Sequence, residues 1–103
     1  MNRTTNKEDV TMHKALAHKR GDDVAVAVVP ISAGDEVLVV YLDDDGEQVI
    51  RAQADVPYGH KVALQPLAAD APVIEYSTQV GVTRARIEPG DYVHTHNVKT
   101  ARW

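Results

Sequence analysis

The sequence predicts a small all-β domain. Its apolar residues are grouped in short Val-rich runs bounded by Gly, Pro and Asp, a pattern typical of strands joined by turns. No stretch keeps helical spacing over a long run, and residues 65–70 can form at most a turn or two of helix. The chain has no Phe, so small and β-branched side chains must build the core, which suits short strands better than thick helix packing.

Short strands are predicted one after another along the chain. Residues 23–29 form an apolar run, which is typical of a strand buried on both faces. The sequence Asp-Asp-Asp-Gly that follows the third strand predicts a hairpin, because Asp and Gly tolerate positive φ. The returning strand alternates, with Ile50 and Ala52 on one face and Arg51 on the other. The predicted strands cover residues 12–20, 23–29, 36–42, 49–56, 73–76 and 80–87.

A short motif recurs where these strands end. Residues 31–37 read apolar-x-x-Gly-x-x-apolar, and residues 56–62 and 87–93 repeat this motif. Residues 67–73 form a degenerate copy, in which Asp70 stands in place of Gly. Each copy ends one strand, turns at a residue that tolerates positive φ, and begins the next strand. We expect a compact, folded-over β-domain with repeated corners, although ordinary β-turns would give the same motif.

The length of the chain limits its organisation. At 103 residues it has room for one domain with a modest core, and we assign residues 12–103 to that domain and residues 1–11 to a flexible polar tail. The absence of Cys excludes disulfides and thiolate metal ligands. A core of this size cannot enclose a large active site, so site-like residues gathered at one end suggest a partner that completes the site.

Charge and hydropathy argue against two classes of partner. The chain has 11 Lys and Arg against 15 Asp and Glu, and its formal net charge of −4 argues against nucleic acid. No run approaches the roughly 18 apolar residues that a membrane span needs. No secretory leader is recognisable either, so we expect a soluble cytoplasmic protein.

Candidate site residues concentrate near the carboxyl end. If the segment after the last Pro-Gly turn is one strand through residues 92–98, Tyr92, His94, His96 and Val98 share one face. Two imidazoles roughly 7 Å apart at Cα can reach one small ligand or metal ion. Lys99 and Arg102 follow, and both are suited to binding anions. An exposed strand end with hydrogen-bonded histidines would explain the same residues without a site.

The corner at residues 56–62 holds a second pair, His60 and Lys61. His60 shares a strand face with Val62 and Leu64, at the mouth of an apolar face, whereas Lys61 points the other way. An imidazole at such a position can be a general base, a metal ligand or an anion contact. It can equally be an ordinary surface histidine.

Five motifs occur in an order that is similar to a known family. They are Asp23-Val24-Ala25-Val26-Ala27, Ile31-Ser32-Ala33-Gly34, residues 56–64, residues 72–76 with Gly81, and residues 89–97. Together they resemble the SAF domain of the altronate/galactarate dehydratase family over residues 12–103. The ending Lys-Thr-Ala-Arg-Trp resembles that of free-standing small subunits. The chain departs from the family at Asp23, where Asn is expected, and at Asp70-Ala71, where a Gly-containing turn is expected.

The resemblance implies a β-clip fold and the small subunit of a hydro-lyase, a sugar-acid dehydratase of altronate or galactarate type. It implies an active site shared with a large catalytic subunit, a small hydroxy acid as substrate, and a divalent metal, iron (Fe²⁺), held jointly by the two subunits. We then expect His60 and Lys61 to be catalytic, His94 and His96 to bind the metal, and Asn97, Lys99 and Arg102 to contact the substrate.

Two other functions fit the same residues. The small subunit of a carbon–sulfur lyase acting on sulfolactate would use the same chemistry at the α-carbon, and the resemblance does not separate loss of water from loss of sulfite. A non-catalytic SAF binding or interaction module needs no site, and the two histidine-bearing segments argue against it. A homo-oligomer of the chain is left open.

Overall fold

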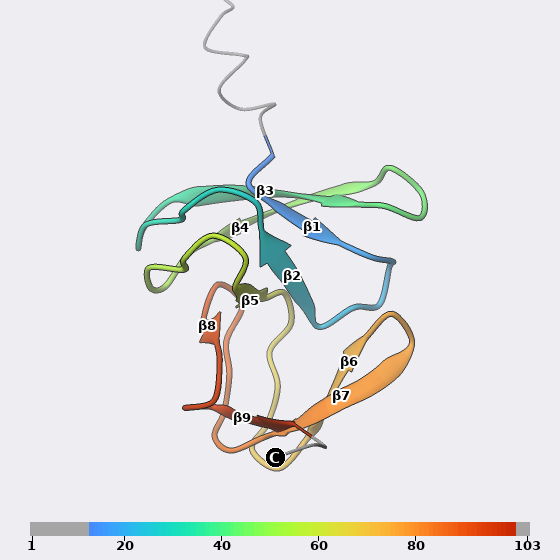
Figure 1. The fold of residues 1–103 in the computed structure, drawn as a ribbon, viewed down its shortest axis with the longest axis vertical. Coiled ribbons are helices and arrows are strands. Elements are labelled where there is room, and N and C mark those ends of the chain that lie inside the picture. Colours follow the sequence, from blue (N-terminus) through green and yellow to red (C-terminus); the bar gives the residue numbers. More distant parts are fainter. Residues whose placement is uncertain (1–12, 101–103) are drawn as a thin grey trace, which may run out of the picture.

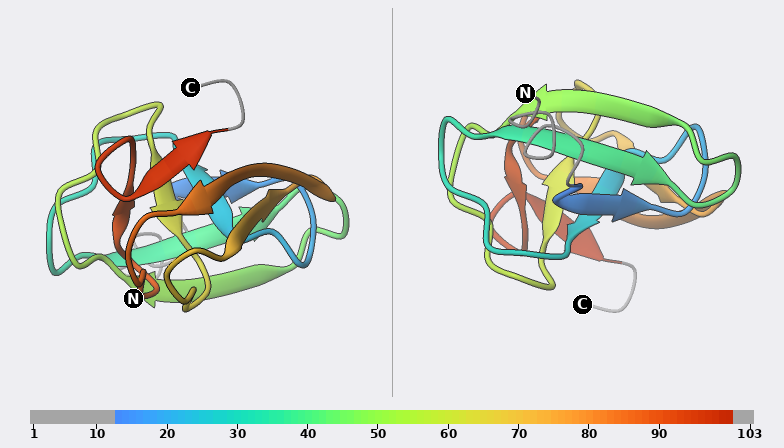
Figure 2. Two further views of the ribbon diagram at one scale, coloured as in Figure 1. Left: turned by 90° about the horizontal axis from the view of Figure 1, so that it is seen from below. Right: turned by 90° about the horizontal axis from the view of Figure 1, so that it is seen from above.

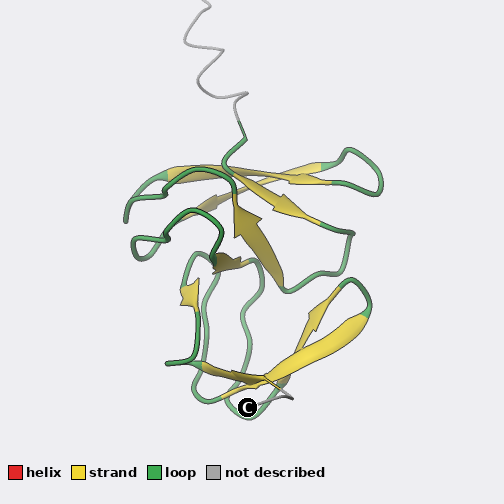
Figure 3. Cartoon of the chain, in the orientation of Figure 1, coloured by secondary structure: helices red, strands yellow, loops and turns green. Residues whose placement is uncertain are grey.

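The computed structural model describes residues 13–100, and within this range it contains strands and loops but no helix (Figure 3). The predicted all-β class is therefore confirmed. The predicted tail at residues 1–11 lies outside the described residues, as do Arg102 and Trp103. The described part of the chain holds no helix long and apolar enough to cross a membrane.

The strands form two sheets. In Figure 1 the smaller sheet lies at the bottom, and β5 and β8 are the part of the larger sheet that lies between its other strands and the smaller sheet. The larger sheet has the order β4-β3-β1-β2-β5-β8, and the smaller has the order β6-β7-β9. Neighbouring strands are antiparallel except β1 and β3, which are parallel. The bounds are β1 (Ala15–Ala17), β2 (Val24–Ala27), β3 (Glu36–Tyr41), β4 (Glu47–Arg51), β5 (Lys61–Ala63), β6 (Pro72–Glu75), β7 (Thr78–Thr83), β8 (Tyr92–Val93) and β9 (Val98–Thr100).

The repeated corners are confirmed as the turns that fold the sheets over. The fourth residue of each motif, including the degenerate copy, has positive φ: Gly34, Gly59, Asp70 and Gly90. The corners also pair with one another, because their first residues form two isolated bridges, Ile31 with Val56 and Leu67 with Ile87. Asp is one of the few residues besides Gly that tolerates this conformation, which explains why the degenerate copy still turns.

Val-rich packing joins the two sheets. One buried cluster combines Val24, Ala63 and Val93 from the larger sheet with Val73 and Val98 from the smaller. The view from below in Figure 2 shows the smaller sheet in front of the strands of the larger one. Burial of these apolar side chains is the main favourable term that holds the two sheets together.

Two acidic residues just before β2 connect the sheets through backbone groups. Asp23 pairs with Ile74 twice, through Asp23 N to Ile74 O at 2.8 Å and Ile74 N to Asp23 Oδ2 at 2.7 Å. The buried carboxylate of Asp22 accepts the N–H of Tyr76 at 2.7 Å and that of His18 at 2.9 Å. A buried carboxylate is tolerated here because backbone donors satisfy its oxygens.

Some predicted strand boundaries are wrong. The strand expected over residues 80–87 ends at Thr83, whose buried hydroxyl donates to Ala68 O at 2.6 Å and accepts from Ala71 N at 2.9 Å. Beyond it the chain must turn to bring Ile87 to its bridge with Leu67. The strand expected over residues 49–56 leaves the ladder after Arg51. The expected two-sided burial of β2 is nearly complete, with Val26 partly exposed.

Candidate functional site

The His60 side chain does not take part in closing its turn, in contrast to the matching residue of the first corner. In the first corner the residue at the same place, Asp35, accepts the N–H of Ser32 at 2.9 Å, and this bond lowers the pKa of the Asp35 carboxyl below its ordinary value of 3.8. In the second corner the matching N–H is missing, because Pro57 occupies that position and proline has no N–H. The His60 side chain therefore has no backbone N–H of the turn to bind, and its hydrogen-bond partner lies elsewhere.

The backbone of this corner is nevertheless fixed. Gly59 N donates to Ala27 O, and Ala27 N donates to His60 O, both at 2.8 Å. The turn itself is closed by His60 N donating to Pro57 O at 3.0 Å. These bonds attach the corner to the end of β2, so His60 stands on a rigid support.

The two carboxyl-terminal histidines lie on a turn, and the prediction of one continuous strand through residues 92–98 is wrong. β8 ends at Val93, and residues 94–97 turn before β9 begins. Asn97 causes the break: its Oδ1 accepts His94 N at 3.0 Å and its Nδ2 donates to Tyr92 O at 2.8 Å. A side-chain amide that bonds to nearby backbone groups competes with the strand ladder, which is typical of Asn in turns.

The turn still brings the predicted histidines together, around a tyrosine. The Tyr92 hydroxyl lies 2.7 Å from His60 Nδ1. The Tyr92 ring stacks on His94 with centroids 5.6 Å apart and an interplanar angle of 7°, and it contacts His96 at 5.6 Å. The rings of His60 and His94 are 5.2 Å apart. Tyr92 thus contacts all three histidines, and we call these four residues the His–Tyr cluster.

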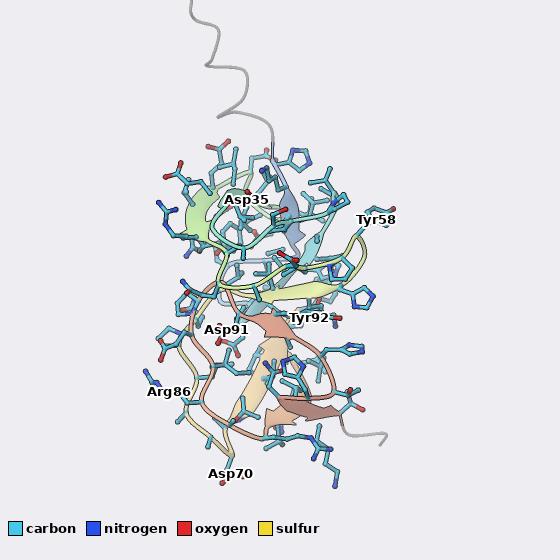
Figure 4. The ribbon with its side chains drawn as sticks, turned by 90° about the vertical axis from the view of Figure 1, so that its left-hand side faces the viewer. Asp35, Tyr58, Asp70, Arg86, Asp91 and Tyr92 are labelled. Carbon is cyan, nitrogen blue, oxygen red and sulfur yellow. The ribbon has the colours of Figure 1, made fainter. Side chains whose placement is uncertain are left out.

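Backbone pairing explains how residues so far apart in the sequence meet. β8 runs antiparallel to β5, with Tyr92 opposite Val62 and Val93 opposite Lys61. His60 directly precedes β5, so this register sets the Tyr92 ring beside it. Figure 4 shows Tyr92 on the same side of the molecule as Tyr58, which belongs to the second corner.

The His–Tyr cluster borders a pocket of about 310 Å³ that lies between the two sheets. His60, Lys61 and His94 contribute to its wall, together with Gly59 and Thr100. The rest of the wall is apolar and is drawn from both sheets: Val24, Val73, Val80, Val93 and Val98. A largely apolar pocket with a few convergent polar groups is the usual form of a binding site.

Lys61 is held at this pocket by a carboxylate that the sequence did not reveal. Its Nζ lies 2.8 Å from Glu75 Oε1, and the side chain of Glu75 is only 11% exposed. On the other side of Glu75, His18 Nε2 lies 3.9 Å from Oε2. Glu75 and Tyr92 are the two site residues that sequence reasoning missed. Tyr92 shared a predicted strand face with the histidines, whereas nothing in the sequence near Glu75 indicated its partner.

The remaining predicted site residues are placed differently. Lys99 alternates on β9 with Val98 and Thr100, which line the pocket, so Lys99 faces away from it. Asn97 uses both ends of its amide to close the turn. Arg102 lies outside the described residues. Roles for these three in substrate binding stay predictions.

The histidine side chains at the pocket can supply part of a metal site. His60 and His94 lie close enough to share a ligand, and imidazole is a common ligand of divalent transition metals. Among residues 13–100, no group of three or more His, Cys, Asp or Glu side chains is placed to hold a metal ion. Within residues 13–100, the imidazoles at the pocket are therefore too few to form a complete metal site.

Comparison with known proteins gives a consistent result. The model of the altronate/galactarate dehydratase SAF domain matches residues 13–101. The alpha subunit of (2R)-sulfolactate sulfo-lyase from Chromohalobacter salexigens is 38% identical over 89 residues, which are 85% of this chain and 95% of that subunit. The corresponding subunit from Paracoccus pantotrophus is 45% identical over 67 residues, which are 65% of this chain and all of that subunit.

A longer relative contains the same segment. Altronate dehydratase from Escherichia coli is 39% identical over 79 residues, which are 77% of this chain but only 15% of that enzyme. The family match spans all of the described residues and includes the corners that carry His60 and Tyr92. This chain belongs to the altronate/galactarate dehydratase SAF domain family.

Proposed function

We propose that this chain is the small subunit of a lyase that acts on a small hydroxy acid, and that it contributes the His–Tyr cluster to an active site completed by a larger catalytic subunit. The convergence of His60, Tyr92 and His94 at the pocket between the sheets carries this proposal. Two histidine-bearing segments from distant parts of the chain meet there.

Elimination from a hydroxy acid needs the groups found at this place. Removing the proton α to a carboxylate builds negative charge on the carboxylate oxygens, and positioned donors or cations stabilise that charge. A base must also accept the proton. Lys61 supplies a cation that Glu75 fixes in position, and the imidazoles of His60 and His94 supply groups that can hold or transfer a proton.

The substrate carboxylate would meet Lys61, and Lys99 and Arg102 remain candidate contacts for a second anionic group. Lys99 faces away from the pocket, so in our proposal it acts at the rim, where the larger subunit covers the small one. Asn97 shapes the turn that presents His94 and His96, and any contact with substrate would add to that role.

We further propose a divalent metal, with iron as the candidate, shared between the two subunits. His94 and His96 would provide imidazole ligands, and the larger subunit would provide the remainder. When bound, such a metal supplies positive charge that stabilises the developing anion. The residues of this chain bind, orient and hold protons around it.

Two forms of this function differ in the leaving group, which is water in a dehydratase and sulfite in a sulfo-lyase. The alignment covers 95% and 100% of the two sulfo-lyase alpha subunits but 15% of the altronate dehydratase. This observation favours carbon–sulfur lysis of sulfolactate as the second candidate beside dehydration of altronate or galactarate. The same pocket serves either reaction, because both begin at the carbon next to the carboxylate.

One experiment tests the proposal. The chain is co-purified with its larger subunit, and the pair is assayed with altronate, galactarate and sulfolactate, with the isolated chain as control. We expect turnover of one of these substrates by the pair and none by the isolated chain. A chain that binds no larger subunit, or a pair inactive on all three acids, would refute the proposal and favour a non-catalytic binding module.

A second measurement separates the proposed histidine roles. The double variant His94→Ala/His96→Ala should fold as the wild type, since both residues lie on an exposed turn. If they are metal ligands, the variant pair loses bound metal together with turnover. If they contact the substrate or transfer protons, turnover falls while the metal content of the pair stays at the wild-type stoichiometry.

A further inference from the structure

The hydrogen bond between Tyr92 and His60 has a consequence for the chemistry of His60. Tyr92 Oη lies 2.7 Å from His60 Nδ1, and both side chains are partly buried. Stacking on His94 and contact with His96 hold the Tyr92 ring in place, and the β5–β8 register holds its backbone. Nδ1 is thus occupied by a well-fixed partner, and Nε2 is the ring nitrogen left for a ligand in the pocket.

The chemistry of the two groups decides which one donates. In a neutral imidazole one nitrogen carries a proton and the other accepts, whereas a phenol can donate or accept. A phenolic O–H is a stronger donor than an imidazole N–H, and the unprotonated imidazole nitrogen is a stronger acceptor than a phenolic oxygen. The arrangement O–H to N is therefore favoured, and it leaves the single imidazole proton on Nε2.

We infer that Tyr92 is a positioning residue that fixes neutral His60 as the Nε2–H tautomer, so that His60 offers a hydrogen-bond donor to the pocket. A donor at this point fits an anionic oxygen, such as a carboxylate, sulfonate or enediolate oxygen. It does not fit a metal ion, which needs the lone pair of an unprotonated nitrogen. His60 is then the group that stabilises negative charge, and metal binding or proton abstraction falls to other residues. The assignment of the ligand rests on the proposed function, whereas the tautomer does not.

Nitrogen NMR of the isolated chain tests the tautomer without any assay of turnover. Ring ¹⁵N shifts distinguish protonated from unprotonated imidazole nitrogens, and loss of one set of signals in His60→Gln assigns the His60 resonances. With the imidazole neutral, we expect the wild type to show Nε2 protonated and Nδ1 unprotonated. In Tyr92→Phe, which keeps the stacked ring, both shifts should move toward each other as the tautomers begin to exchange.

The matched control is Tyr58→Phe. Tyr58 also lies close to His60 in the sequence, but it is 68% exposed, and its variant should leave the His60 shifts unchanged. A wild-type spectrum with the proton on Nδ1, or unchanged His60 shifts in Tyr92→Phe, would overturn the inference. The wild-type spectrum alone decides the tautomer even if Tyr92→Phe does not fold.

Two variants of His60 in the active pair test the donor role. The amide nitrogen of Gln extends to about the position of Nε2, whereas that of Asn stops near the position of Nδ1. Loss of one donor to a developing anion costs about 10²–10³-fold in kcat, so His60→Asn should lose this factor and His60→Gln should retain at least about tenfold more activity. Equal losses in both variants would overturn the donor role while leaving the NMR result for the tautomer intact.

Discussion

Replacement of Gly90 by Ala should remove a large part of the unfolding free energy of this domain, whereas the same change at Gly34 should remove much less. The two residues have nearly the same backbone conformation, with φ of +92° and +91°. A Cβ at Gly34 would meet nothing within 4 Å, but a Cβ at Gly90 would overlap the carbonyl oxygen of Arg51. The pair therefore isolates the cost of the close approach from the cost of the positive φ.

The expected magnitudes follow from these contacts. A residue other than Gly in this left-handed conformation costs about 1–2 kcal/mol, which is the whole effect that we expect for Gly34→Ala. To relieve the overlap, Gly90→Ala must also move the corner and weaken two bonds, Gly90 N to Ala63 O at 2.8 Å and Gln53 N to Gly90 O at 2.9 Å. At about 0.5–1.5 kcal/mol for each bond, the total becomes about 2–5 kcal/mol.

Urea unfolding followed by circular dichroism measures both values. A domain of this size has about 5–15 kcal/mol of stability, so the Gly90 variant remains measurable unless the wild type lies near the lower limit. Because the Gly90 corner leads directly into β8, the variant should also shift the ring signals of Tyr92. Equal losses of unfolding free energy in the two variants would show that the corner does not pack against Arg51 as described.

Three further predictions concern the acidic residues. Asp22→Ala removes a buried acceptor of three backbone N–H groups. It should lower the unfolding free energy by about 3 kcal/mol or more in urea titrations, and a loss below about 1 kcal/mol would contradict the bonding described. Glu75→Gln should change the unfolding free energy by less than about 1 kcal/mol, because its partner Lys61 is partly exposed. It should still reduce turnover of the pair, because it frees Lys61. Unchanged turnover would show that the ion pair has no part in the site. The Ser32 N–H lowers the pKa of the Asp35 carboxyl below 3.8, so the stability that this bond contributes is complete above that value and is lost as pH falls through the lower folded-state pKa. Asp35→Asn should therefore flatten the fall of stability in acid unfolding below about pH 4, and an identical acid profile would contradict the assignment.

The sequence was sufficient for the fold class and for the corners. Each corner depends on one local requirement, a residue that tolerates positive φ, and even Asp70 in the degenerate copy meets it. Three members of the His–Tyr cluster were also singled out, because His60, His94 and His96 stand out by type in a Val-rich chain.

What the sequence did not predict depends on contacts between distant segments. The strand expected through residues 92–98 is broken by Asn97, whose amide binds the backbone on both sides of the turn, and alternation alone carries no sign of such a bond. The pairing of Tyr92 with His60 follows from the β5–β8 register. Glu75 reaches Lys61 only because the smaller sheet packs against the larger one.

Substitution at His60 in the reconstituted pair tests the central claim most directly, namely that the His–Tyr cluster belongs to an active site shared with a larger lyase subunit. The measurement is kcat of the pair with His60→Ala, alongside its subunit stoichiometry. The matched control is His13→Ala, at an exposed histidine outside the cluster. We predict that His60→Ala lowers kcat by about 10²–10³-fold with unchanged assembly, while His13→Ala has no effect. Full turnover of the His60→Ala pair, or turnover by the isolated wild-type chain, would contradict the account.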